Sequence, residues 1–398
     1  MKKQLLFVTQ YLHTGGIEKS LLTLLSDINY DEYDVDLLLF DHSGVLFKFI
    51  PPQVNIQPPL FETFSTSLLY AAPELIRKGK FRLLTVKILA ASLSKFSKGI
   101  GTGIRWKVYR HILKSPKKHY DVAISYIDFF CNYYVTELVS ANKKIVYNHM
   151  DYAYSQGKGC ACPKLERKSF SKCNYIVTVA ESSKKSLESH FPEFSKKIHV
   201  IHNRISPTTV HSLSNDQEVI KDIQHIKNFK IVTVARLVEE KGVFLALKAC
   251  QMLIYRGYEI SWIFIGNGPL MEELRIKSKD MGIEKNFILL GEKENPYPYM
   301  QICDIYVQPS KTEAHCVAVE EAIALACPII VTDIPAFNDQ IQHEDTGFIV
   351  KANVEGIVEG ICKLINSKQL REKLSTNLMN LSGRNHEELE KFNRLISS

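Results

Sequence analysis

The chain has 398 residues, 45% of them hydrophobic, which is enough for two domains with cores of their own. No apolar run reaches the roughly 18 residues of a membrane-spanning helix, and the run after the first lysines is too short for a signal peptide. We therefore expect a cytoplasmic protein. The net charge of +7 is local, because residues 77–118 hold 13 Lys and Arg and no Asp or Glu. The remainder of the chain is slightly acidic, so overall charge does not indicate the partner.

The N-terminal part begins with strand, turn and helix. Leu5–Thr9 predicts a strand, Gly15 and Gly16 belong to a glycine turn, and Ile17–Leu25 predicts a helix. A glycine turn between a strand and a helix lets the backbone approach a ligand closely, although many such turns only close a βα unit.

Asp34 and Asp36 form a D-x-D pair, which is a metal site in some sugar transferases. Here the two aspartates alternate with Val35 and Leu37 where the second predicted strand begins. We interpret them as ordinary strand residues and expect no metal site.

Residues 61–116 interrupt the alternation of predicted strands and helices. Their leucines and isoleucines recur at near-helical spacing, with the basic residues between them. This pattern predicts an insertion of basic amphipathic helices that faces an anionic surface, a membrane rather than nucleic acid, since no nucleic-acid-binding motif accompanies it. The alternative is a helical face that is simply solvated.

Alternation resumes with four predicted strands, the second of which is followed by His149: Val122–Tyr126, Lys144–Tyr147, Tyr175–Val179 and Ile198–Ile201. We expect an N-terminal domain over residues 1–205, a polar linker over 206–228 and a C-terminal domain over 229–383. Residues 384–398 predict a helix whose apolar residues need cover, and we expect it to pack back on the N-terminal domain.

The second half repeats the pattern of strand, turn and helix. A strand over Lys230–Ala235 is followed by Arg236 and Lys241, and a strand over Trp262–Ile265 by a glycine turn that includes Gly266. Arg and Lys five residues apart across a strand-to-helix turn suit a diphosphate, the Arg as a bidentate fork and the Lys as a point charge.

Residues 304–333 predict strand, loop, helix and strand. The first turn of the helix would direct free N–H groups near Cys316 and Val317 toward an anion. Glu313 lies in the loop before this helix and Glu321 lies within it. The two carboxylates are too far apart to bind one atom, but they can hold hydroxyl groups on either side of a phosphate, which is the shape of a sugar nucleotide.

Several of these motifs resemble a known family. VARLVEEKG, IGNGP and EAHCVAVEEA, with GGIE near the start, resemble the retaining glycosyltransferases of family four over nearly the full chain. The family has the α/β GT-B fold, in which two Rossmann-like domains face each other across a cleft. Residues 289–310 resemble its bacterial capsule and exopolysaccharide branch.

The resemblance implies roles for individual residues. Arg236 and Lys241 would bind the donor diphosphate near Gly266, Glu321 the ribose and Glu313 the transferred sugar. Gly16, with Gly15 before it, would meet the phosphates, and His149 would lie near donor sugar and acceptor, unless it is a histidine of a surface loop. The family usually has Gly-Phe after the first Glu, whereas Ala314 and His315 stand here, which puts the choice of donor sugar in doubt.

The function that the resemblance implies is retaining transfer of a hexose from a UDP-sugar to a lipid-linked oligosaccharide in bacterial surface polysaccharide assembly. The enzyme would act at the inner face of the cell membrane. It would need no metal or other cofactor, since Arg236, Lys241 and the helix N-terminus neutralise the leaving diphosphate. Two alternatives stay open: a UDP-sugar epimerase of the same fold, and a non-catalytic partner subunit.

Overall fold

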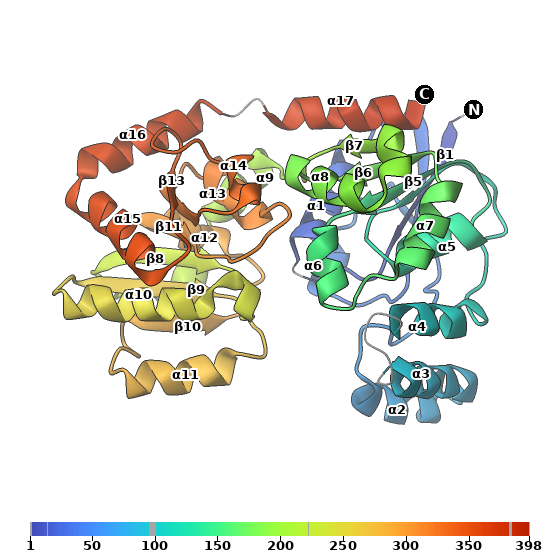
Figure 1. The fold of residues 1–398 in the computed structure, drawn as a ribbon, viewed down its shortest axis with the longest axis horizontal. Helices are drawn as coiled ribbons and strands as arrows, with labels where there is room; N and C mark the ends of the chain where they lie inside the picture. The colour runs from blue at the N-terminus through green and yellow to red at the C-terminus, as the bar shows by residue number, and fades with distance from the viewer. Residues whose placement is uncertain (1, 14, 95–100, 222, 382–383, 398) are drawn as a thin grey trace. The chain divides into compact units, whose positions relative to one another are not determined.

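The computed structural model describes residues 2–13, 15–94, 101–221, 223–381 and 384–397 (Figure 1). The chain divides into two compact units: unit 1 consists of residues 1–203 and 388–398, and unit 2 of residues 204–387. Each unit contains one parallel sheet with helices around it. The predicted α/β class with two Rossmann-like sheets is confirmed.

Unit 1 has a seven-stranded sheet in the order β3-β2-β1-β4-β5-β6-β7. Its strands are β1 (Lys3–Thr9), β2 (Tyr33–Leu39), β3 (Asn55–Ile56), β4 (Tyr120–Ser125), β5 (Ala141–Asn148), β6 (Tyr175–Thr178) and β7 (Ile198–Val200). Most of these residues are buried, as expected for a parallel sheet covered on both faces. The order reverses between β1 and β4, and ligands of open α/β sheets bind outside the carboxyl ends of strands at such a point.

The helices of unit 1 are α1 (Gly16–Asp27), α2 (Leu68–Arg77), α3 (Phe81–Ser94), α4 (Gly101–Arg110), α5 (Phe130–Leu138), α6 (Tyr152–Gly157), α7 (Pro163–Lys172), α8 (Glu181–His190), the 3₁₀ turns η1 (Val45–Phe49) and η2 (Pro192–Lys197), and α17 (Arg384–Ser397). Figure 1 shows α2 and α3 side by side beyond α4, away from the sheet of unit 1. Among the described residues, no helix is both long and apolar enough to cross a membrane.

Unit 2 has a six-stranded sheet in the order β10-β9-β8-β11-β12-β13, which reverses between β8 and β11. Its strands are β8 (Phe229–Val234), β9 (Ile260–Ile265), β10 (Phe287–Gly291), β11 (Ile305–Gln308), β12 (Ile329–Thr332) and β13 (Phe348–Val350). Its helices are α9 (Pro207–Ser214), α10 (Val243–Tyr255), α11 (Met271–Asp280), α12 (Tyr297–Gln301), α13 (Val317–Ala324), α14 (Pro335–Asn338), α15 (Val354–Asn366) and α16 (Lys368–Met379), with the 3₁₀ turns η3 (Gln217–Ile220) and η4 (Glu239–Lys241).

The predicted linker over residues 206–228 is wrong. Its first part is α9, which begins with Ser206 as the N-cap, accepting a hydrogen bond from the N–H of Thr209. The apolar side chains of this segment, Val210, Ile220 and Ile223, are buried in the core of unit 2. Because they bury apolar surface there, the segment is part of that unit.

The last helix, α17, belongs to unit 1 from residue 388 onward. Phe392 is 1% exposed and stacks on Phe7 of β1 at 6.1 Å between ring centroids. Glu388 accepts the N–H of His202 at 2.8 Å, and Lys143 Nζ donates to the carbonyl of Leu395 at 3.0 Å. The helix is therefore held both by its apolar face and by polar contacts near each end.

Several basic residues of the insertion form ion pairs that the sequence did not indicate. Lys78 pairs with Glu74 at 2.7 Å, Lys80 pairs with Glu62, Arg110 with Glu137 and Lys118 with Asp36. All four carboxylates come from outside residues 77–118, so counting charge within that segment missed them. Lys87 is buried and donates to the carbonyl of Thr63. Lys95 and Lys98 lie outside the described residues.

Candidate functional site

The end of β8 and the end of β11 lie together at the point where the sheet of unit 2 reverses. Gly242, which follows η4, brings the two loops into contact. Its backbone is left-handed at φ 67°, and a Cβ atom there would lie 1.7 Å from the carbonyl oxygen of Pro309. Only glycine fits this approach without a shift of backbone. The contact places Lys241, the residue before Gly242, beside the loop that follows β11.

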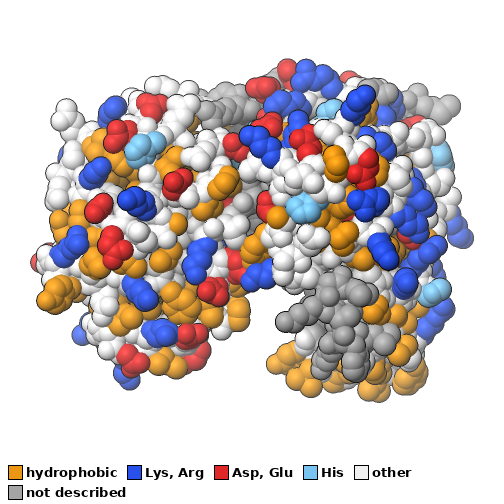
Figure 2. Space-filling model, viewed as in Figure 1, with side chains coloured by type: hydrophobic (Ala, Val, Ile, Leu, Met, Phe, Trp, Pro, Cys, Tyr) orange, Lys and Arg blue, Asp and Glu red, His pale blue; other side chains and the backbone are white. Residues whose placement is uncertain are grey.

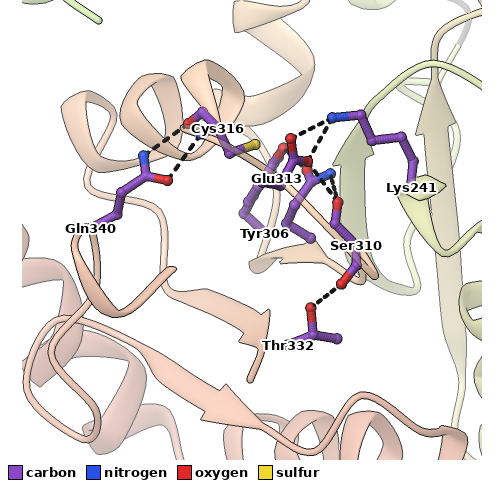
Figure 3. Close-up of polar contacts among 8 residues, drawn as sticks. Lys241, Tyr306, Ser310, Glu313, Cys316, Thr332 and Gln340 are labelled. Atoms are coloured by element: carbon purple, nitrogen blue, oxygen red, sulfur yellow. Dashed lines mark hydrogen bonds and ion pairs between the residues drawn. The ribbon is translucent and has the colours of Figure 1, made fainter. Parts of the chain in front are cut away.

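Lys241 and Glu313 form an ion pair at this place (Figure 3). Lys241 Nζ lies 2.6 Å from both carboxylate oxygens of Glu313, and the side chains are 21% and 8% exposed. Burial alone would lower the pKa of Lys241, but the Glu313 carboxylate outweighs it, so the pKa is raised. Lys241 therefore stays charged at neutral pH, as a phosphate-binding lysine must.

A network of hydrogen bonds between buried side chains holds Glu313. Ser310 Oγ donates to Glu313 at 2.8 Å and accepts from Gln308 Nε2 at 3.0 Å, and Gln308 accepts from Tyr306 at 2.7 Å. Thr332 also donates to the carbonyl of Ser310. Because each donor has an acceptor, the network is satisfied and holds the carboxylate in one place. Ser310 was not predicted from the sequence, although its spacing of three residues from Glu313 was a usable signal.

The start of α13 differs from expectation. The N–H of Cys316 is not free, because it donates to Gln340 Oε1 at 3.0 Å. In the described part of the chain, no acceptor is seen for the N–H of Val317, the first residue of the helix. The helix N-terminus can therefore still favour an anion, but through Val317 and the helix dipole and not through Cys316.

Glu321 lies one helical turn further along and faces the interior. It is 1% exposed, and Tyr297 of α12 donates to its carboxylate at 2.9 Å. Burial and the Glu321 carboxylate raise the pKa of Tyr297 well above its usual value, so this hydroxyl remains a donor. Tyr297 thus orients Glu321, and the two carboxylates singled out from the sequence have separate partners.

Arg236 and Gly266 follow the neighbouring strands β8 and β9. Arg236 is exposed at the end of β8. Gly266 has φ 142°, and a Cβ atom there would lie 2.0 Å from the carbonyl oxygen of Ala235. Its own N–H donates to the carbonyl of Gly291 at 2.8 Å. Gly266 therefore serves the close approach of the two loops, while Arg236 supplies an exposed cation at this edge.

The glycine turn of unit 1 lies beside a carboxylate of the protein, that of Glu18. Gly15 caps α1, and a Cβ atom at Gly15 would lie 2.1 Å from Glu18 Oε2. The Glu18 carboxylate is 7% exposed and lies over the first turn of its own helix, where negative charge is favoured. The expectation that Gly16 meets a donor phosphate therefore requires this carboxylate to move.

His149 follows β5 in unit 1 and is 4% exposed, so its interpretation as a surface-loop histidine is wrong. Its Nε2 lies 2.9 Å from the carbonyl oxygen of Tyr126, which can only accept, so Nε2 carries the proton. Burial lowers the pKa of His149 to about 3. The ring is therefore neutral, and its buried Nδ1, which has no partner among the described residues, is an acceptor.

Asp128, which the sequence analysis missed, holds the backbone of His149. Both carboxylate oxygens lie 3.0 Å from the N–H of His149. The side chain is 3% exposed, and burial raises its pKa to about 7. A buried carboxyl group with a raised pKa, three residues after β4, makes this edge of the sheet a candidate functional site.

The D-x-D pair has protein partners. Asp36 accepts from Tyr120 at 2.8 Å and Lys118 at 3.0 Å, and Asp34 accepts from Gln4 at 2.8 Å. Within the ranges that the structure describes, no group of three or more His, Cys, Asp or Glu side chains could hold a metal ion.

Part of the chain that contains this site matches a known protein family. Residues 216–380 match the family model described as glycosyl transferases group 1. These residues form a glycosyl transferases group 1 domain. Lys241, Glu313 and Glu321 all lie in the group 1 domain, as do Arg236 and Gln340.

Two curated relatives match parts of the chain. The Staphylococcus aureus protein "Capsular polysaccharide biosynthesis glycosyltransferase CapM" is 30% identical over 154 residues, which is 38% of this chain and 40% of that protein. A Campylobacter jejuni N-acetylgalactosaminyltransferase, named for its diphospho-undecaprenol-linked acceptor, is 24% identical over 205 residues, 51% of this chain and 54% of that protein. The matches thus span about half of each relative or less.

The fold extends beyond this domain. The crystal structure of Anabaena HepE in complex with UDP covers the whole of both chains with a TM-score of 0.67 at 16% identity. At this identity the likeness shows the fold alone, which is the GT-B fold of glycosyltransferases.

Proposed function

We propose that the chain is a retaining glycosyltransferase that moves a hexose from a UDP-sugar to a lipid-linked oligosaccharide in bacterial surface polysaccharide assembly. The observation that carries the proposal is the Lys241–Glu313 pair at the switch point of the group 1 domain. The UDP bound to HepE supports the donor class, and the acceptor in the name of the Campylobacter relative supports the acceptor class.

The pair suits a sugar nucleotide because its two members bind different parts of it. Lys241 would turn to the diphosphate, and Arg236 would add a bidentate fork from the end of β8. Glu313 would then offer its oxygens to hydroxyl groups of the transferred sugar. Glu321, oriented by Tyr297, would hold the ribose.

Departure of the diphosphate would build negative charge, and in this proposal Arg236, Lys241 and the N-terminus of α13 would neutralise it. The proposal therefore needs no metal ion. In this proposal Glu313 binds hydroxyl groups of the transferred sugar while Ser310 holds one of its oxygens, so we do not assign it as a covalent nucleophile. Front-face attack by the acceptor, with the leaving phosphate taking the proton, agrees better with this arrangement.

His149 has a narrower role than that of an acid or base. With a pKa of about 3 and Nε2 protonated, the ring has Nδ1 as its remaining acceptor at neutral pH, and this buried atom would reach a ligand only after a local movement. In the proposed reaction it would receive a hydroxyl of donor or acceptor and would not exchange protons with it.

The insertion would bring the enzyme to an anionic membrane surface. Its helices expose large apolar side chains, which Figure 2 shows gathered over the part of unit 1 that carries α2 and α3. Leu69 is 78% exposed, Tyr70 76% and Phe81 60%, with Ile76, Ile88 and Leu89 also exposed. An exposed apolar patch bordered by cations fits the interfacial zone of a lipid bilayer.

The proposal is tested with a panel of UDP-, GDP- and ADP-sugars in a thermal-shift assay, because a ligand that binds the folded state raises its stability. A UDP-sugar that raises Tm is then incubated with extracted lipid-linked acceptor, and the anomeric configuration of the product is read by NMR. Retention in the product is the expected result. Inversion, or a preference for GDP- or ADP-sugars, would contradict the proposal.

The two alternatives give different outcomes in the same assay. A UDP-sugar epimerase would convert the UDP-sugar without any acceptor. A non-catalytic partner subunit would bind the UDP-sugar and give no product with any acceptor. The presence of Arg236, Lys241 and Glu321 favours the transferase over a non-catalytic subunit. The basic insertion over residues 61–116, which an epimerase would not need, favours the transferase over an epimerase.

A further inference from the structure

Gln340 makes a two-point contact with one residue of the donor loop, residues 313–316. Its Oε1 accepts the N–H of Cys316 at 3.0 Å, and its Nε2 donates to the carbonyl of the same residue at 3.0 Å. The same Nε2 also donates to Glu320 Oε1 at 2.7 Å. Only a planar amide of this length offers one acceptor and two donors in this arrangement.

The rest of the fold fixes Gln340 itself. It is 2% exposed and lies just after α14, between two core residues, Phe337 and Ile341, which are 0% and 2% exposed. The N–H of Gln340 donates to the carbonyl of Phe337 at 3.1 Å. The amide therefore approaches the loop from a rigid base, so it can determine where the loop lies.

The donor loop is thus fixed at both ends. Figure 3 shows Lys241 reaching Glu313 from one side and Gln340 reaching Cys316 from the other. Between these points lie Ala314 and His315, and His315 Nε2 lies 3.4 Å from the same Glu320 oxygen that Gln340 contacts. A displacement at Cys316 would therefore be passed to His315 through the peptide bond that joins them, and to Glu313 through three peptide bonds.

We propose that Gln340 is the positioning residue of the donor loop, and that it sets the fit of the transferred sugar by fixing Cys316 and thereby His315, the residue before it. The proposal rests on the proposed function, since it assigns the loop to the sugar. It predicts that changes at Gln340 weaken a UDP-sugar more than UDP, because Glu321, assigned to the ribose, is oriented by Tyr297 from outside the loop.

The test uses Gln340→Glu, which keeps the shape and exchanges the donating nitrogen for an oxygen. When ionised, this carboxylate has no proton to donate and faces the Cys316 carbonyl and the Glu320 carboxylate. The ionisable groups around it are Glu320, His315 and the Cys316 thiol, with Lys241 and Glu313 beyond Cys316. Burial and the nearby Glu320 charge would raise the pKa of the new carboxyl, so it would be protonated at mildly acidic pH and donate again.

We expect Q340E to bind a UDP-sugar at least about tenfold more weakly than wild type at pH 8, since one hydrogen bond becomes a repulsion. UDP alone should change much less. At pH 5.5 the affinities of wild type and Q340E for the UDP-sugar should become similar. The double variant E320Q/Q340E should also bind nearly as wild type does at pH 8, because the amide at position 320 can donate to the carboxylate at position 340. Deuterium exchange of residues 313–320 should be faster in Q340E at pH 8, with or without ligand.

Three results would overturn the inference: equal losses for UDP and the UDP-sugar, an affinity difference between wild type and Q340E that does not depend on pH, or unchanged exchange of the loop. Thermal unfolding of each variant separates these results from a loss of fold. If wild type binds no UDP-sugar, the proposed function fails and this inference fails with it. If wild type binds and Q340E matches it, only the inference fails.

Discussion

Lys241 Nζ lies 2.6 Å from both carboxylate oxygens of Glu313, so the cation and the anion assigned to different parts of the donor hold each other. A ligand that binds between them must replace this contact. In the proposed complex, the donor phosphate would bind Lys241 and the sugar hydroxyls would bind Glu313. Before a donor binds, Lys241 and Glu313 therefore neutralise each other, so neither of these two mostly buried charges lacks a counterion.

Lys241→Ala and Glu313→Ala should each lower Tm, because each leaves the partner charge largely buried without its counterion. The double variant K241A/E313A should lose less stability than the two single variants together. All three should lose transfer activity. Thermal unfolding of the four proteins gives the coupling, and purely additive changes in Tm would show that the pair contributes nothing to the fold.

Glu321→Ala should weaken both UDP and the UDP-sugar by about 1.5–3 kcal/mol, the typical loss of a charge-assisted hydrogen bond. Tyr297→Phe is the matched control, because it removes the hydroxyl that orients Glu321 and leaves the carboxylate. It should weaken UDP by a smaller amount. Calorimetric titration measures both, and an E321A protein that folds and binds UDP normally would contradict the ribose assignment.

Transfer should continue in EDTA, because Arg236, Lys241 and the N-terminus of α13 neutralise the leaving diphosphate. Asp36→Asn should lower Tm through its contacts to Tyr120 and Lys118 without creating a metal requirement. Strict dependence on added Mn²⁺ or Mg²⁺, measured after chelation and dialysis, would reopen Asp34 and Asp36 as ligands.

The apolar patch on α2 and α3 should matter more for membrane binding than the paired lysines. Replacing Leu69, Tyr70 and Phe81 by Ser should abolish binding to anionic liposomes, because these side chains are 78%, 76% and 60% exposed. Tyr255→Ser in unit 2 is the matched control, since Tyr255 is 91% exposed on α10.

Salt should weaken this liposome binding only in part, because Lys78 and Lys80 already pair with carboxylates. Lys87 is unsuitable for a charge-removal set, since it is buried against Thr63 and its loss would disturb the fold. A triple Ser variant that binds liposomes as wild type does would return α2 and α3 to the status of a solvated helical face.

Asp128 should make the stability of unit 1 depend on pH. Burial raises its pKa from the usual 3.8 to about 7, so the folded state binds a proton that the unfolded state releases. Its contribution is complete below about pH 4 and is lost as pH rises through about 7. Asp128→Asn removes this loss, so the Tm of D128N relative to wild type should be higher at pH 8 than at pH 5. A constant difference in Tm across this range would contradict the raised pKa.

The sequence predicted the parts of the fold that depend on local pattern. Apolar runs such as those of β1 and β11 identify buried parallel strands, and the turns after them place Lys241 and Glu313 at one edge of a sheet. The linker prediction failed because α9 is polar on its outer side, and its few buried residues, Val210 among them, do not stand out in composition.

The contacts that the sequence did not predict join residues far apart in the chain. Gln340 and Cys316 are 24 residues apart, and Lys118 and Asp36 are 82 apart. A glutamine in a loop carries no motif, so its role depends on the path of the intervening chain. For the same reason Lys118 could not be paired with Asp36 from the sequence, whereas Glu74, four residues before Lys78, could have been paired with it.

The division of the chain has a consequence for its synthesis. Unit 1 is completed by residues 388–398, which leave the ribosome after all of unit 2. Until α17 is made, Phe7 of β1 lacks the Phe392 ring that stacks on it, and His202 lacks Glu388. The nascent unit 1 therefore lacks these contacts while residues 204–387 are translated, and its packing is completed only after unit 2 has been made.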